Sequence, residues 1–263
     1  IYNLYFYMLK KRIVPILLSK NNVLVKGIKF NSSRIVGSII PSIQIFNTRQ
    51  VDELIFIDIN STQNNIINFD LINEISKLCF CPLTVGGGIK TIDDIRQLLA
   101  NGADKVCINT TAYLNQDLIH EAVKIFGSQS IVISIDVKKI GDEYICFRNS
   151  GTIQTEYDLI SWLKIVETFS VGEILITSID KDGTMSGYDI DLIKITQNNV
   201  SIPVLAAGGC SSYYNMLQVF KETDISALCA SSIFQFTQCT PKLAKKYLRE
   251  NNINIRPVFM SNE

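Results

Sequence analysis

Two pairs of short segments carry residue types suited to binding phosphate. Gly86-Gly87-Gly88 follows one apolar run and Asn109-Thr110 follows the next, and Gly208-Gly209 and Ser231-Ser232 repeat that order in the second half of the chain. Glycines let backbone N–H groups approach an anion, and amide and hydroxyl side chains add donors. We therefore predict two phosphate sites, one at Gly87, Gly88, Asn109 and Thr110 and one at Gly208, Gly209, Ser231 and Ser232. Such a pair favours an elongated, phosphorylated small molecule with a phosphate at each end.

Histidine and cysteine contribute little to the predicted chemistry. His120 is the sole histidine and lies in a helical pattern, which excludes histidine-based triads. The seven cysteines form no CxxC pair, and several lie within apolar runs. We therefore expect reduced, buried thiols and no metal site.

Short β-branched runs alternate with longer helical patterns, such as residues 91–101 and 189–197. Continuous apolar strands separated by helices are typical of a parallel sheet that is buried on both faces. Eight such units in 263 residues predict one α/β domain, a (β/α)8 TIM barrel. The expected strands are residues 12–18, 54–60, 82–85, 105–108, 131–136, 173–178, 203–207 and 226–230. An open doubly wound sheet is the alternative, but it usually has a Gly-rich first turn, where this chain has Ser19-Lys20-Asn21-Asn22.

An internal repeat supports the barrel. Residues 51–56 (VDELIF) correspond to residues 171–176 (VGEILI), and residues 82–88 (PLTVGGG) correspond to 203–209 (PVLAAGG). The two halves are therefore predicted to be duplicated half-barrels. Duplicated ligand sites should then meet at the C-terminal rim, where barrels of this class hold their chemistry.

Composition limits the partners. Lys and Arg together number 25, as do Asp and Glu, so the formal net charge is zero. This balance gives no electrostatic basis for binding nucleic acid or a membrane surface. No apolar run reaches the length of about 18 residues that a membrane span needs, and we expect a cytoplasmic protein. Residues 1–7 are interpreted as an extension of uncertain origin before Met8, and residues 8–263 as the barrel domain.

Several longer motifs carry a family resemblance. They are GADKVCINT (102–110), FGSQ (126–129), TSIDKDGT (177–184) and SGYD (186–189). On these motifs the chain resembles the cyclase subunit of imidazole glycerol phosphate synthase from about residue 8 to residue 258. The isomerase of the same pathway shares the half-barrel duplication but lacks a segment like TSIDKDGT.

The resemblance implies a barrel that works with a HisH-like glutaminase as a heterodimer and needs no cofactor. Ammonia from the glutaminase enters at the N-terminal end, crosses the barrel and attacks a bisphosphorylated ribulosyl substrate at the C-terminal rim. Two aspartates then serve as general acid and base. Asp136 matches the one on the fifth strand, and Lys26 matches a lysine of the first loop. Asp182 and Gly183 fall near the second phosphate site.

Four charged residues match the ammonia gate of that family, namely Arg12, Glu53, Lys105 and Glu173. Charged residues at strand starts are commonly just solvated. Four together, with alternating signs and on alternate strands, instead fit a ring of mutual ion pairs inside the barrel floor. Buried without such partners, these charges would be costly.

The first strand departs from the family at one catalytic position. The family reads R-I-I-P-C-L-D-V-K, whereas this chain has RIVPILLSK at residues 12–20, so that Leu18 replaces the first aspartate. Leucine cannot transfer a proton. Ser19 cannot substitute, because successive strand side chains point to opposite faces. Ordinary cyclase activity is therefore expected to be severely impaired.

Three functions remain open at the level of sequence. Retention of the gate and the phosphate segments, with loss of one carboxylate, resembles paralogues of the acetamidino branch of surface-polysaccharide (lipopolysaccharide) biosynthesis. There the barrel supplies ammonia to a separate sugar amidotransferase. The second is a histidine-biosynthesis cyclase that uses Asp136 to form imidazole glycerol phosphate and AICAR. The third is a non-catalytic module that binds a phosphate ligand.

Overall fold

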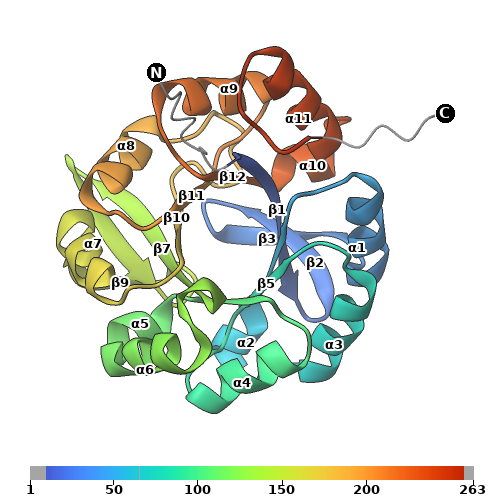
Figure 1. Ribbon diagram of the computed structural model, residues 1–263. Helices are drawn as coiled ribbons and strands as arrows, with labels where there is room; N and C mark the ends of the chain where they lie inside the picture. Colours follow the sequence, from blue (N-terminus) through green and yellow to red (C-terminus); the bar gives the residue numbers. More distant parts are fainter. Residues whose placement is uncertain (1–9, 65, 258–263) are drawn as a thin grey trace, which may run out of the picture.

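Eight parallel strands close into a barrel in the computed structural model, which describes residues 10–64 and 66–257 (Figure 1). Each strand pairs with the next, and β12 pairs with β1 to complete the ring, with Arg12 opposite Ala227. The fold is thus the (β/α)8 barrel predicted from sequence. The described part forms one barrel, while the extension proposed for residues 1–7 lies outside the described residues. The barrel strands are β1 (Arg12–Lys20), β4 (Leu54–Asp58), β5 (Leu83–Gly86), β6 (Lys105–Ile108), β7 (Ile131–Ile140), β10 (Glu173–Ser178), β11 (Val204–Ala207) and β12 (Ala227–Ala230).

The predicted and observed strands agree closely except at β1 and β7. The bounds of β6 and β10 are those expected from the sequence. In contrast, β1 and β7 continue past the barrel, to Lys20 and Ile140. Each continues because an antiparallel hairpin pairs with its projecting end.

The two hairpins that follow β1 and β7 were not expected from the sequence. The first consists of β2 (Val23–Ile28) and β3 (Asn31–Gly37), and the second of β8 (Glu143–Arg148) and β9 (Ile153–Asp158). Asn21 and Asn22, between β1 and β2, both have positive φ, as the tight turns that join hairpin strands require. One hairpin follows the first barrel strand and the other follows the fifth, so the two halves match in their insertions as well as their strands.

Helices surround the barrel (Figure 1). Thr91 is the N-cap of α4, in a reciprocal capping box with Asp94, and Asn101 is the C-cap, so the helix lies one residue inside the predicted range at each end. None of the described helices has the length and apolar character that crossing a membrane requires. The longer helices are α1 (Ile39–Thr48), α3 (Phe69–Leu78), α4 (Ile92–Ala100), α6 (Gln116–Phe126), α7 (Leu159–Thr168), α8 (Ile190–Asn199), α9 (Tyr213–Glu222) and α11 (Pro241–Glu250), and the shorter ones are α2 (Ile59–Asn64), α5 (Thr110–Leu114), α10 (Ser232–Phe236) and the 3-10 turn Ser128–Ser130.

Alternation along the strands creates two separate apolar cores. Val106 and Ile108 of β6 belong to the large core between strands and helices, whereas Cys107 belongs to a small core inside the barrel. This is the inside–outside pattern of a closed sheet. The interior core consists of Val14, Ile55, Cys107, Val132, Leu175, Leu205, Ala207, Ala227 and Cys229.

Candidate functional site

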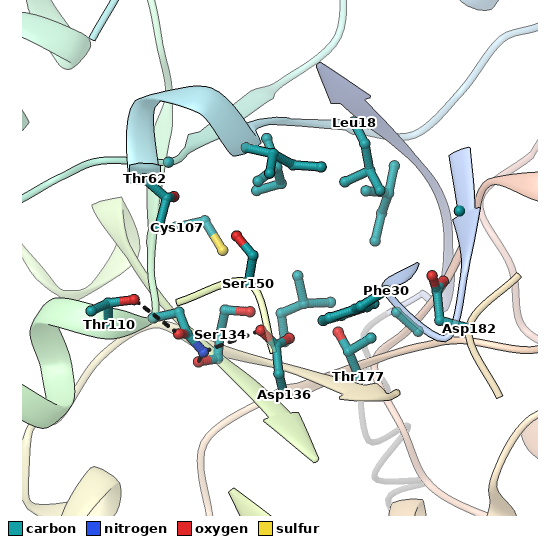
Figure 2. Close-up of a pocket in the computed structure, with 18 of the residues that line it drawn as sticks. Leu18, Phe30, Thr62, Cys107, Thr110, Ser134, Asp136, Ser150, Thr177 and Asp182 are labelled. Atoms are coloured by element: carbon teal, nitrogen blue, oxygen red, sulfur yellow. Dashed lines mark hydrogen bonds between the residues drawn. The ribbon is translucent and has the colours of Figure 1, made fainter. Parts of the chain in front are cut away.

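A cavity of about 780 Å³ opens at the C-terminal ends of the strands. Figure 2 shows its labelled side chains converging from both hairpins and from several barrel strands. Residues of both predicted phosphate sites line it, namely Gly87, Gly88, Asn109, Thr110, Gly208 and Ser231. Gly209 and Ser232 line a narrow recess beside it, together with Lys26, Asp182 and Gly183. The structure thus gathers the predicted rim residues in one region.

The side chains at the first predicted phosphate site are already engaged with neighbouring loops. Asn109 Nδ2 donates to the carbonyl oxygen of Ser134 at 3.0 Å and approaches Asp136 Oδ2 at 3.4 Å. Thr110 Oγ1 accepts the backbone N–H of Asn149 at 3.0 Å. These two residues therefore connect the end of β6 to β7 and to the second hairpin.

The glycines have a packing reason in addition to the phosphate role that the sequence suggested. A Cβ on Gly87 would meet the carbonyl oxygen of Asp58, and one on Gly208 would lie 2.7 Å from the carbonyl oxygen of Ser178. Both have φ above +100°. Glycine is thus required because the loop after the preceding barrel strand packs against the backbone, in the same way in each half. This packing aligns the rim loops, and an anion is not needed to explain the residue type.

Ser232 carries an unpaired hydroxyl at the second predicted phosphate site. Its Oγ is buried and has no hydrogen-bond partner in the described part of the chain. Ser231 Oγ, in contrast, pairs with Gln235 Oε1 at 3.3 Å. A buried hydroxyl without a partner is costly, so the Ser232 hydroxyl is suited to receive a ligand or water in the recess.

Asp136 is a carboxylate of the cavity wall whose pKa is clearly raised. It lies on β7, and its side chain points into the open space in Figure 2. Burial, and secondarily the negative charge of Asp182, raise its pKa to about 7, while a hydrogen bond from Thr177 opposes that shift. A carboxyl with such a pKa can both accept and donate a proton near neutral pH.

Leu18 occupies the facing wall (Figure 2). It is half-buried and lines the cavity beside Ile16 and Ile57, so the wall immediately around Leu18 is apolar, with Lys20 following at the end of the same strand. Ser19 is 1% exposed and is absent from the cavity lining. The strand alternation therefore turns its hydroxyl away from the site, as expected from the sequence.

A buried ion pair holds the first hairpin over the rim. Lys26 Nζ lies 2.6 Å and 2.9 Å from the two carboxylate oxygens of Asp182. The backbone N–H of Lys29 also donates to the carbonyl oxygen of Asp182 at 2.8 Å. These contacts join residues on opposite halves of the chain, and no sequence pattern indicated the pairing.

The four charged residues at the strand starts form a closed ring of ion pairs. Lys105 Nζ lies 3.0 Å from Glu53 and 2.6 Å from Glu173. Arg12 pairs with Glu53 and, at 2.7 Å, with Glu173. Mutual pairing inside the barrel was predicted, but the placement on alternate strands is wrong, because the four residues lie at the starts of the first, second, fourth and sixth barrel strands, with Glu53 just before the second. The closed ring sits at the opposite end of the barrel interior from the cavity.

Several cavity residues were missed by sequence analysis. Ser134 and Thr177 follow from strand alternation, since each faces the same side as Asp136 or Leu175. Phe30 and Ser150 lie at hairpin turns, which had not been recognised (Figure 2). Conversely, His120 lies on the helical layer, in edge contact with Phe169 and outside the cavity lining.

The fold and site define a (β/α)8 barrel with a ligand cavity at its C-terminal rim and a charged ring at its floor. A family model described as histidine biosynthesis protein matches residues 12–240. The imidazole glycerol phosphate synthase subunit HisF of Hydrogenobaculum sp. is 44% identical to this chain. The similarity covers 95% of this chain and the whole of that subunit. The subunits of Prosthecochloris aestuarii and Bacillus cereus are 42% and 41% identical with the same coverage. The chain therefore belongs to the HisF family of histidine biosynthesis proteins.

Proposed function

We propose that this HisF-family barrel receives ammonia from a HisH-like glutaminase and releases it at the C-terminal rim for a separate sugar amidotransferase. The acceptor reaction converts an N-acetyl group of a surface-polysaccharide sugar into an acetamidino group. The observation that carries this proposal is the apolar wall formed by Leu18 opposite Asp136, in a barrel that keeps the charged ring. Delivery of ammonia needs the interior path, whereas cyclisation needs two proton-transfer groups.

The missing carboxylate has a large expected effect on cyclisation. General acid–base assistance contributes roughly 10²–10⁴-fold per group. In the described part of the cavity wall around Leu18, the neighbouring side chains Ile16 and Ile57 cannot transfer protons. Asp136 therefore has no acidic counterpart on that wall, and cyclase turnover should be very low.

The interior suits the passage of neutral ammonia. Above the ring of Arg12, Glu53, Lys105 and Glu173 lies the small apolar core, which includes Val14, Leu175 and Cys229. Moving an ion into such surroundings costs far more than moving a neutral molecule. Ammonium would thus have to lose a proton at or below the ring, and an opening of the ring would admit ammonia.

The rim is proposed to hold a phosphorylated small molecule. Gly87, Gly88, Asn109 and Thr110 would bind one phosphate, and Gly208, Gly209, Ser231 and Ser232 the other. Support comes from the shared cavity and from the unpaired Ser232 hydroxyl. Lys26 would supply a positive charge, with Asp182 and Gly183 holding its hairpin in place. Ligand occupancy could then be coupled to the state of the hairpin.

A second candidate function is cyclisation in histidine biosynthesis. The specific observations in its favour are the pKa of about 7 for Asp136 and the 40–44% identity to subunits named HisF. In this case Asp136 would serve as both acid and base, and the product pair would be imidazole glycerol phosphate and AICAR. It requires that one carboxyl do the work that the family assigns to two.

One assay separates the candidates. The purified chain is supplied with ammonium and the bisphosphorylated ribulosyl substrate, and in parallel with a glutaminase and glutamine. Ammonia supply predicts stimulation of the glutaminase with negligible cyclase turnover. Turnover near that of an ordinary HisF subunit would overturn that proposal and establish the cyclase. Ligand binding with neither activity would instead identify a non-catalytic phosphate-binding module.

A further inference from the structure

Cys79 and Cys81 form a close thiol pair at the N-terminal face of the barrel. Cys79 is the C-cap residue that follows α3, and a single proline separates Cys81 from β5. Their sulfur atoms are 3.6 Å apart, and Cys79 Sγ also lies 3.4 Å from the carbonyl oxygen of Cys81. Phe80 between them is 85% exposed. The two sulfurs are therefore already in contact at an accessible loop.

The surroundings distinguish this pair from the other cysteines. The hydrogen bond from Cys81 is the largest influence on Cys79 and lowers its pKa to about 7, whereas that same contact raises the pKa of Cys81. Both are only half-buried, unlike Cys107 and Cys146, whose pKa values are raised to about 12, chiefly by burial. Because the thiolate is the reactive form, the lowered pKa of Cys79 makes it the expected attacking thiol of the pair.

We propose that Cys79 and Cys81 are a redox-active dithiol, which low-molecular-weight disulfides such as oxidised glutathione convert into an intraloop disulfide. The Cys79 thiolate attacks one sulfur of the small disulfide and expels one small thiolate, which leaves a mixed disulfide on Cys79. Cys81 then loses its proton and attacks the Cys79 sulfur, expelling the second small thiolate. Two electrons pass from the pair to the oxidant, and two small thiols are formed. Neither step depends on ammonia transfer.

The loop anchors make this disulfide easy to reverse. Phe80 N–H donates to Asn47 Oδ1 at 3.1 Å, and the carbonyl oxygen of Pro82 accepts Leu54 N–H at 2.9 Å. The residue between the two cysteines and the residue after them are thus held, while the sulfurs must close from 3.6 Å to about 2.05 Å. Strained and exposed disulfides have more oxidising potentials and are the labile ones. The adjustment falls on the Cys79–Cys81 segment, whose Phe80 side chain is exposed.

The purified chain is equilibrated in glutathione buffers that contain an increasing proportion of oxidised glutathione. Free thiols are then blocked with iodoacetamide, and the chain is digested with trypsin. Cleavage after Lys77 and Lys90 gives a peptide, residues 78–90, that contains just these two cysteines. We expect the doubly alkylated peptide to be replaced by one with no label, lighter than the reduced peptide by two hydrogen atoms. Cys239, which is also half-buried, is the internal control and should stay alkylated at those ratios.

Single variants test the assigned order. At pH 7, limiting iodoacetamide should label Cys79 before Cys81 in the unmodified chain, and Cys81→Ser and Cys79→Ser should each stop at a glutathione adduct because the second thiol is missing. Circular dichroism verifies that both variants remain folded. The proposal is overturned if Cys239 is oxidised at ratios that leave the 78–90 peptide fully alkylated. Equal labelling of Cys79 and Cys81 in the unmodified chain would likewise reject Cys79 as the attacking thiol.

Discussion

Leu18 and Asp136 face one cavity from opposite sides of the barrel. They lie on β1 and β7, which are separated by three barrel strands in either direction around the ring. One wall is consequently apolar, while the other carries a buried carboxyl with a pKa of about 7. This asymmetry, in a barrel whose two halves otherwise match, is the observation on which the proposed ammonia-supply role depends.

Restoring a carboxyl at position 18 should restore cyclisation if the remainder of the site is intact. We expect Leu18→Asp to raise the rate of imidazole glycerol phosphate formation from the bisphosphorylated substrate and ammonium by about 10²-fold or more, since it returns one proton-transfer group. Leu18→Asn is the matched control, because it adds polarity without an ionisable group. Adding Asp136→Asn to Leu18→Asp should abolish the gain. An equal gain with asparagine would show that polarity, and not proton transfer, limits the reaction.

Asp136 should make the stability of the protein depend on pH. Its pKa is raised from 3.8 to about 7 in the folded chain, so the folded state binds more protons than the unfolded state between these values. Stability is therefore lost as the pH rises from about 4 to about 7, and the loss persists above that range. Asp136→Asn removes this penalty and should raise the free energy of unfolding at pH 8 by up to about 4 kcal/mol, with little change at pH 4.

Urea denaturation at both pH values measures this effect. Asp142→Asn is the control, since Asp142 is an exposed aspartate on the turn between β7 and β8. A stabilisation by Asp136→Asn that is equal at pH 4 and pH 8 would contradict the assignment of a buried, titrating carboxyl.

The charged ring should contribute to stability as a unit. Lys105→Met leaves Glu53 and Glu173 with Arg12 as their shared partner, in surroundings where each carboxylate is largely buried. Removal of one member of such a network should lower the free energy of unfolding by about 2 kcal/mol, discounted for partial solvent access. Lys194→Met, which breaks an exposed ion pair with Glu222, is the control and should have little effect. Similar urea midpoints for the two variants would mean that the ring is fully solvated.

The rim glycines should be intolerant of a side chain because of packing. Gly208→Ala would bring its Cβ to 2.7 Å from the carbonyl oxygen of Ser178 at a φ of +101°. We expect a loss of about 2–4 kcal/mol, since the clash adds to the cost of a left-handed backbone. Gly141→Ala is the matched control, with a φ of +62° and open space around its Cβ, and should lose only about 1 kcal/mol. Thermal unfolding compares the two, and equal losses would remove the packing explanation.

The features that could be predicted from the sequence are those set by the alternation of strand side chains and by the internal repeat. Glu173 and Leu175 face the interior because strand side chains alternate. The match between residues 82–88 and 203–209 was sufficient to locate both rim turns from the sequence. Lys26 and Asp182 are 156 residues apart, and no periodicity connects them. The hairpin that carries Lys26 was missed because it lies outside the barrel and lacks the continuous apolar run by which the buried strands were recognised.

The unpaired hydroxyl of Ser232 gives a test of the second phosphate site that is independent of catalysis. Because this Oγ makes no hydrogen bond in the described part of the chain, Ser232→Ala should leave the thermal unfolding temperature unchanged or slightly higher. If the hydroxyl donates to a phosphate, the same variant should weaken binding of a bisphosphorylated sugar by about tenfold, the effect of about 1.4 kcal/mol. Isothermal titration calorimetry measures the affinity.

Ser212→Ala is the contrasting variant for this test. Ser212 Oγ accepts the Asn215 N–H as the N-cap of α9, so its removal should lower stability by about 1 kcal/mol and leave the affinity unchanged. A Ser232→Ala variant that binds the bisphosphate as tightly as the wild type would assign the hydroxyl to a buried water and remove it from the phosphate site.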